Sequence, residues 1–220
     1  MVASELLTVR LRLRPFASDL SDLAALHEIQ ADPEHMRYYP HPFSVDESRE
    51  WIKKWLAHEK QHGFSLWAIE DRETAEFLGN CGPAIQLVDG EQHVELGWSV
   101  TPRRVRQGIA SEAAAAWRDQ CLGPMGLDHV ISLVRPENAP SRGVAERIGM
   151  APWKETTFGS QGWRHIVYRV DAHATALGGQ RSVSMSMMSA QSSPRSPGST
   201  AVRREHHRHH MDRSPLLDRR

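Results

Sequence analysis

The hydrophobic and polar positions of this 220-residue chain follow different periods in different segments. In residues 9–14 each apolar residue is followed by an arginine, and this alternation predicts a half-exposed strand. Apolar positions then recur at helical spacing, which predicts helices over 18–29 and 44–63, separated by a proline-rich aromatic loop at 38–43. The predicted helix N-caps are Ser18 or Asp19 for the first and Ser44 or Asp46 for the second.

After Gly63 the period shortens toward two, which predicts an antiparallel meander of three strands over 64–70, 77–87 and 93–100. An alanine-rich helix, a strand, a helix and two strands follow, over 108–122, 129–134, 139–148, 153–158 and 163–170. The resulting order, βααβββαβαββ, predicts an α+β (mixed α/β) fold. We expect one central, mostly antiparallel twisted sheet of about seven strands with four helices.

The composition of the chain changes near residue 170. All fifteen aromatic residues precede Asp171, and the remainder is rich in Ser, Met, Arg and His. Such a segment buries too little apolar surface to offset the entropy of ordering. The sequence therefore predicts a folded domain over 1–170 and a disordered tail over 171–220.

The charge balance excludes some classes of partner. Lys+Arg and Asp+Glu both total 27, so neither nucleic acid nor an anionic membrane is indicated as a bulk partner. No run approaches the roughly 18 apolar residues of a membrane helix, and Met1 is not followed by a basic and then an apolar segment. Cys81 and Cys121 suit reduced core thiols better than a disulfide framework. We expect a soluble, cytoplasmic protein.

The segment from Val100 to Ala113 is the best candidate for chemistry. A strand ends, a basic loop with one glycine follows, and a long helix begins, so that backbone N–H groups converge at the positive helix end. Gly108 lets the backbone approach a ligand closely, and Arg103, Arg104 and Arg106 could neutralise phosphate charge. The loop taken alone is equally compatible with a solvated turn before a well-capped helix.

Several separated motifs resemble one known family. Val105 to Ala110 occupies the six positions of Q/R-x-x-G-x-G/A, the cofactor motif of the GNAT superfamily of acetyltransferases. Residues 11–16 (LRLRPF), 95–98 (ELGW), 110–113 (ASEA), 135–141 (RPENAPS) and 145–150 (AERIGM) are similar to its ribosomal-protein N-terminal acetyltransferase-like (RimJ/RimL-like) branch. The resemblance covers about residues 6–170 and implies a GNAT fold.

The sequence departs from the family pattern in two places. Val105 stands where Gln, Arg or an aromatic residue is common, and Arg106 stands where a second glycine is frequent. The tyrosine that many members use as thiolate acid would fall at Ala145, and it is commonly missing in this branch as well.

The resemblance implies acetyl-CoA as cosubstrate and no metal. The cofactor-binding residues it indicates are Ser99, Val100, Thr101, Arg103, Arg106, Gln107, Gly108, Ile109, Ala110, Ser111 and Asn138. Glu95 becomes the candidate base, acting directly or through water, and Ser141 the candidate proton donor to the thiolate. Glu95 would otherwise be a solvent-facing or ion-paired strand carboxylate, and Asn138 and Ser141 would otherwise be helix caps.

The activity implied is transfer of an acetyl group to a primary amine, by direct attack in a ternary complex. The acceptor is either a protein N-terminus or a small amine, and its entrance would lie near the loop residues Tyr38, Tyr39, His41 and Phe43. The sequence leaves open whether the chain is a monomer or a homodimer.

Three other interpretations stay open. Residues 58–62 (HEKQH) match the zinc-peptidase pattern H-E-x-x-H, although Gly63 ends the helix at once and no further histidine follows at metzincin spacing. His206 to His210 could also bind a transition metal as an unstructured, adventitious site. A non-enzymatic alternative is a module that binds acyl-CoA as a sensor without transferring the acyl group.

Overall fold

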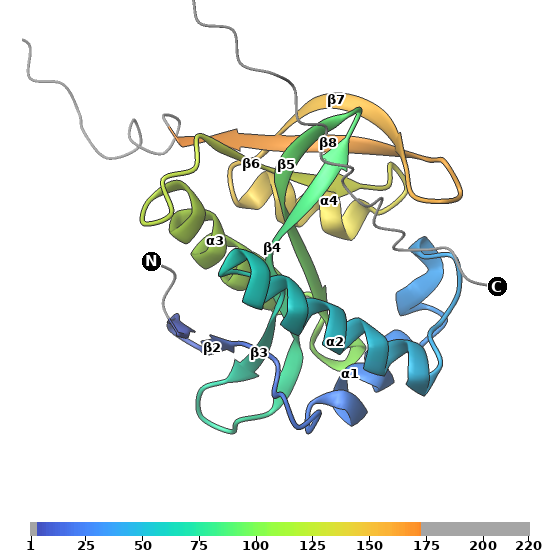
Figure 1. Cartoon of the computed structure of the whole chain (residues 1–220), viewed down its shortest axis with the longest axis vertical. Helices are drawn as coiled ribbons and strands as arrows, with labels where there is room; N and C mark the ends of the chain where they lie inside the picture. Colours follow the sequence, from blue (N-terminus) through green and yellow to red (C-terminus); the bar gives the residue numbers. More distant parts are fainter. Residues whose placement is uncertain (1–3, 173–220) are drawn as a thin grey trace, which may run out of the picture.

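The structure, a computed structural model, describes residues 4–172. Within them one sheet of eight strands has the order β1-β2-β3-β4-β5-β6-β8-β7, and four α-helices and two 3₁₀-helices accompany it (Figure 1). Seven of these strands and the four α-helices match the predicted elements. The eighth strand, β1, is a two-residue addition at the edge.

The strands are β1 Leu6–Leu7, β2 Leu11–Arg14, β3 Trp67–Asp71, β4 Phe77–Val88, β5 Glu91–Val100, β6 His129–Val134, β7 Ala151–Phe158 and β8 Trp163–Asp171. The helices are α1 Leu23–Gln30, η1 His35–Tyr38, α2 Val45–His62, η2 Pro102–Arg104, α3 Ile109–Leu122 and α4 Ala139–Arg147. None of the helices described is long and apolar enough to cross a membrane.

The sheet continues slightly past the predicted domain boundary. Asp171 is the last residue of β8, and the Ala172 N–H donates to the Asp128 carbonyl at 2.8 Å. The rest of the predicted tail, with His206 to His210, lies outside the described residues.

The two faces of the sheet are covered by different helices. Leu96 and Val100 of β5 belong to a core cluster that includes Ala113 and Trp117 of α3. The opposite face packs against α2, where Trp55 contacts Leu66 and Ala84. We call these the α3 face and the α2 face. Because side chains alternate along a strand, Glu95, Gly97 and Ser99 lie on the α2 face.

The neighbours β5 and β6 form the one parallel pair among the described strands, and they separate along their length. β5 pairs with β4 over all ten of its residues, whereas its register with β6 consists of Glu95 opposite Ile131. One residue later, the Leu96 carbonyl accepts from the Ser132 hydroxyl at 2.6 Å. Beyond this point the β6-facing backbone groups of β5 have no strand partner among residues 4–172.

The structure confirms one predicted helix start and corrects the other. Ser44 caps α2 and forms a capping box with Glu47, and Gly63 ends the helix in the left-handed region at φ 77°. The first helix begins at Leu23 with Asp22 at the N-cap, so the prediction of Ser18 or Asp19 as its N-cap was wrong.

The reason for the later start is a tertiary contact. The Asp22 carboxylate accepts from Arg14 Nη1 and Nη2 at 2.8 and 2.7 Å, and from the Ala17 N–H at 2.8 Å. Leu20 has φ 63°, which a helix cannot contain. The local pattern of 18–22 gives no sign of a distant arginine.

We expect Ser44→Ala to lower the free energy of unfolding by about 1 kcal/mol, because the Glu47 N–H in the first turn of α2 loses the Ser44 hydroxyl that accepts from it. Chemical denaturation monitored by circular dichroism measures the change. Ser18→Ala is the matched control and should leave the unfolding midpoint in place. Equal losses in both variants would contradict the assigned cap.

Candidate active site

The junction between β5 and α3 presents unpaired backbone donors. Gly108 occupies the N-cap with φ 79° and offers no side-chain cap. The N–H groups of Ile109, Ala110 and Ser111 have no acceptor among the described residues, as expected of a first helical turn. This arrangement fits a phosphate or pyrophosphate, with the helix dipole adding favourable charge.

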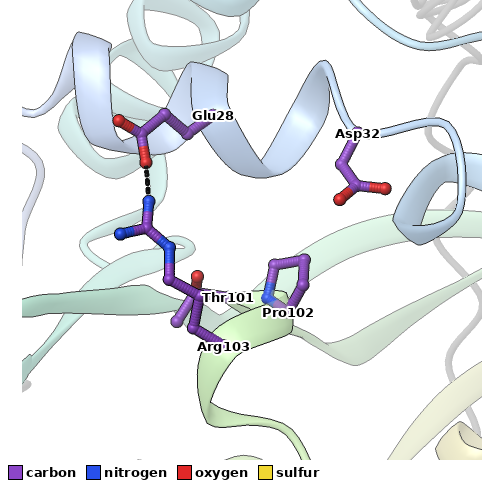
Figure 2. Close-up of a pocket in the computed structure, with 5 residues that line it drawn as sticks. All are labelled: Glu28, Asp32, Thr101, Pro102 and Arg103. Atoms are coloured by element: carbon purple, nitrogen blue, oxygen red, sulfur yellow. Dashed lines mark hydrogen bonds and ion pairs between the residues drawn. The ribbon is translucent and has the colours of Figure 1, made fainter.

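Ion pairs take up two of the three loop arginines. Arg103 pairs with Glu28 of α1, as Figure 2 shows, and Arg104 pairs with Glu76. Both arginines therefore tie the loop to the rest of the fold. Arg106 has no ion pair within residues 4–172 and is the loop cation left for an anionic ligand.

A fourth arginine, outside the loop, fixes its far end. Arg10 donates to the Gln107 carbonyl at 3.0 Å and, through Nε, to the Glu112 carboxylate at 2.7 Å. Glu112 also accepts from the Arg10 N–H at 2.9 Å. The carboxylate in the first turn of α3 is thus turned toward β2 instead of capping its own helix. The sequence pattern identified Arg10 only as an outward strand position.

Arg106 has a left-handed backbone, with φ 63°. A non-glycine residue with this backbone conformation costs about 1–2 kcal/mol relative to glycine. The flanking contacts of Arg104 and Arg10 hold the loop in this path.

A cavity of about 130 Å³ lies at the separation of β5 and β6 and draws residues from both faces of the sheet. From the α2 face come Tyr38, Tyr39, Glu95, Arg135 and His165. Trp98, Ser132, Asn138 and Ser141 contribute from the α3 face and the start of α4. The cavity therefore connects the two faces through the sheet.

Glu95 lies within this cavity in a poorly solvated position. Its Oε1 accepts from the Leu133 N–H at 3.3 Å, across the gap between β5 and β6. Burial raises the pKa of Glu95 to about 7, despite hydrogen bonds from Leu133 and Gln86 that favour the charged form. Burial and the nearby Glu95 carboxylate also raise the pKa of Tyr39.

Asn138 and Ser141 combine two of the roles considered from the sequence. The Asn138 side chain accepts from the Ser141 N–H at 3.1 Å, so it is the N-cap of α4. Both residues also line the cavity that contains Glu95. Capping therefore accounts for the Asn138 carbonyl oxygen, whereas the Ser141 hydroxyl makes no hydrogen bond within residues 4–172.

The other predicted cofactor residues are partly engaged already. The Thr101 N–H donates to the Leu78 carbonyl at 2.8 Å, and Val100 packs in the core. The Ser99 hydroxyl contacts His35 Nε2 at 2.8 Å, and burial lowers the pKa of His35. Ser111 accepts from Arg147 at 3.2 Å, which brings a further cation to the start of α3.

A second cavity of about 360 Å³ lies beside the end of β5, between α1 and η2 (Figure 2). Asp32, Thr101 and Pro102 line it, together with the Glu28–Arg103 ion pair. Its lining shares no residue with the cavity around Glu95.

The residues of the H-E-x-x-H pattern are engaged in structural hydrogen bonds. His58 Nδ1 donates to the Phe64 carbonyl at 2.9 Å, and its Nε2 accepts from the Ile85 N–H at 3.2 Å. Glu59 accepts from Trp67 Nε1 at 3.0 Å. No lone pair of His58 is left for a metal ion, so this motif joins α2 to the sheet.

Comparison with known proteins agrees with this geometry. The acetyltransferase (GNAT) domain family matches residues 10–151. YkkB of Bacillus subtilis, itself uncharacterised, is 35% identical over 67% of this chain and 85% of its own length. YnaD of the same organism, an uncharacterised N-acetyltransferase, is 29% identical over 65% of this chain and 80% of its own. The chain belongs to the GNAT family of acetyltransferases and is an acetyltransferase.

Solved structures share the fold. An acetyltransferase from Agrobacterium tumefaciens is 30% identical, with a TM-score of 0.64 over 77% of this chain and 95% of that one. RimJ of Mycobacterium smegmatis in complex with CoA-disulfide is 23% identical, with a TM-score of 0.56 over 77% and 89%. The predicted GNAT fold, with RimJ among its structural neighbours, is confirmed.

We expect Arg106→Gly to be more stable than Arg106→Ala by about 1 kcal/mol, because both lose the same charge and glycine alone relieves the left-handed backbone. Thermal denaturation of the two variants measures the difference. The same pair at Arg103, which lies in the 3₁₀-helix η2, should give the opposite order. If the alanine variant were more stable than the glycine variant at both positions, the left-handed conformation of Arg106 would be contradicted.

Proposed function

We propose that the chain transfers an acetyl group from acetyl-CoA to a primary amine by direct attack within a ternary complex. The observation that carries this proposal is the cavity through the sheet, which places Glu95 of the α2 face and Ser141 of α4 around one space. A donor on one face and an acceptor on the other can meet there without crossing the core.

The donor side is supported by the junction at Gly108. Backbone N–H groups of 109–111 and the unpaired Arg106 suit the pyrophosphate, and Arg147 beside Ser111 adds positive charge. The β6-facing backbone of β5 beyond Leu96 is available to the pantetheine arm. Acetyl-CoA would supply the activated acyl group as a thioester, and an N–H of this backbone could stabilise the oxyanion.

Glu95 is the proposed base. An amine attacks only when neutral, so a group must accept the ammonium proton near neutral pH. With its pKa raised to about 7, Glu95 is deprotonated in a large fraction of molecules at pH 7 and is a stronger base than an ordinary carboxylate. The proton passes to Glu95 directly or through a water molecule.

Ser141 is the proposed proton donor to the leaving thiolate. Its backbone N–H donates to the Asn138 side chain at the start of α4, and Ser141 lines the cavity that contains Glu95. Tyr39, whose raised pKa keeps it protonated, lies on the opposite side of the same space. The absence of a family tyrosine at Ala145, which is buried in the core, is consistent with a donor elsewhere.

We expect acetyl-CoA to raise the melting temperature of the protein, and Gly108→Val to reduce this shift. A side chain at φ 79° would distort the N–H groups that face the phosphates, and losing one charged hydrogen bond weakens binding by about tenfold or more. Gly126→Val is the control, since Gly126 also has a positive φ of 68° but follows the opposite end of α3. Equal ligand shifts in both variants would remove the phosphate site from this loop.

We expect kcat/KM to rise with pH up to about 7 and then level off, because Glu95 acts when deprotonated. Glu95→Gln should lower kcat/KM by about 10²- to 10⁴-fold and abolish this limb while leaving the acetyl-CoA thermal shift intact. Glu91→Gln, at an exposed position of the same strand, should keep both the pH dependence of kcat/KM and the thermal shift with acetyl-CoA. An unchanged profile in Glu95→Gln would exclude Glu95 as the base, and stabilisation without thiol release for any amine would indicate a binding module.

A further inference from the structure

The cavity around Glu95 contains a cation that the proposed reaction does not use. Arg135 follows β6 and lines the same 130 Å³ space as Glu95. Its side chain is 21% exposed. A guanidinium that lines this cavity requires an explanation, because a charge in a poorly solvated site is costly unless it is well paired.

The bonding of Arg135 leaves its outer edge unoccupied. Nε lies 3.4 Å from a carboxylate oxygen of Glu137, which is itself 64% exposed. The guanidinium stacks on the Trp163 ring, with its central carbon 4.2 Å from the ring centroid. Nη1 and Nη2 make no hydrogen bond to any residue within 4–172. Stacking therefore fixes the plane of the guanidinium while two donors stay available.

The neighbouring imidazole does not compete for these donors. His165 Nδ1 donates to the Trp163 carbonyl at 2.8 Å. Burial lowers the pKa of His165, and the charge of Arg135 lowers it further. His165 is therefore neutral near pH 7, and Arg135 is the only cationic side chain of this cavity among the described residues.

We propose that the acceptor carries a carboxylate beside its primary amine, as a compact amino acid does. Arg135 binds the carboxylate through Nη1 and Nη2, and this places the amine toward Glu95. The inference rests on the proposed function, since it assigns the acceptor of that same site. One cavity with a carboxylate and an arginine fork matches both charges of a zwitterion.

Other amine classes match the cavity less well. A peptide N-terminus has a neutral amide where the amino acid has its carboxylate, so the Arg135 fork would lose a charged partner. A polyamine would bring a second positive charge close to Arg135.

The test measures thiol release from acetyl-CoA by the full chain. The acceptors are common L-amino acids, each compared with its amide, together with N-terminal peptides and spermidine. We expect kcat/KM for the preferred amino acid to exceed that for its amide by about 10- to 100-fold, the range of a charged hydrogen-bond pair. Arg135→Gln should remove this preference by lowering kcat/KM for the acid and sparing the amide.

Two further variants separate recognition from folding. Arg135→Lys keeps the charge and loses the fork, so it should retain part of the preference. Arg164→Gln, an exposed arginine of β8 paired with Glu155, should behave as the wild type. Melting temperatures establish whether Arg135→Gln is folded, and calorimetric binding of the amino acid to the CoA-bound protein gives a readout independent of turnover.

The outcomes distinguish this inference from the proposed function. Acetylation of peptides, amides or spermidine in preference to amino acids would overturn the role of Arg135 and leave acetyl transfer standing. Equal losses for acids and amides in a folded Arg135→Gln would do the same, since they indicate a structural role. If none of the amines in the panel supported thiol release, both proposals would be overturned.

Discussion

The separation of β5 from β6 is the constraint on which the site depends. β5 stays paired with β4 to its last residue, Val100, but leaves β6 after Glu95. At the other end the strands are held together: Thr156 of β7 donates to Asp89 at 2.6 Å, and Lys154 pairs with Asp89 at 2.7 Å. The β4–β5 turn is therefore fastened to β7 at the far edge of the sheet.

The loop after β5 depends on contacts from three other elements. Glu28 of α1, Glu76 of the β3–β4 turn and Arg10 of the β1–β2 turn each hold one part of it. Exposed ion pairs contribute little stability individually, about 0–1 kcal/mol. Their combined effect is to hold the loop in a path that leaves Arg106 in an unfavourable backbone conformation and without an ion pair among residues 4–172.

The sequence predicts local features well and tertiary ones poorly. Ser44, Gly63 and Gly108 act through their own neighbours, so capping and turn rules located them. Asp22 shows the limit: its role depends on Arg14 across a turn, and the helix start moved with it.

The same limit applies to the site. Glu95, Asn138 and Ser141 were predicted because they lie in motifs that resemble a family, and the structure brings all three to one cavity. Arg135 belongs to such a motif too, but it stacks on Trp163, a residue 28 positions further along the chain. No motif in the sequence around His165 predicts a site residue. His165 reaches the cavity because β8 pairs with β6.

The position of Glu95 links stability and activity in opposite directions. A carboxyl whose pKa rises from 4.5 unfolded to about 7 folded binds its proton more tightly in the native state. Its contribution therefore favours folding less as the pH rises from 4.5 through 7, and the native state keeps a charge it solvates poorly. In the proposed mechanism the same poor solvation suits Glu95 to act as a base near neutral pH. An exposed carboxylate on β5 would be easier to accommodate, but its lower pKa would make it a weaker base for the ammonium proton in the proposed reaction.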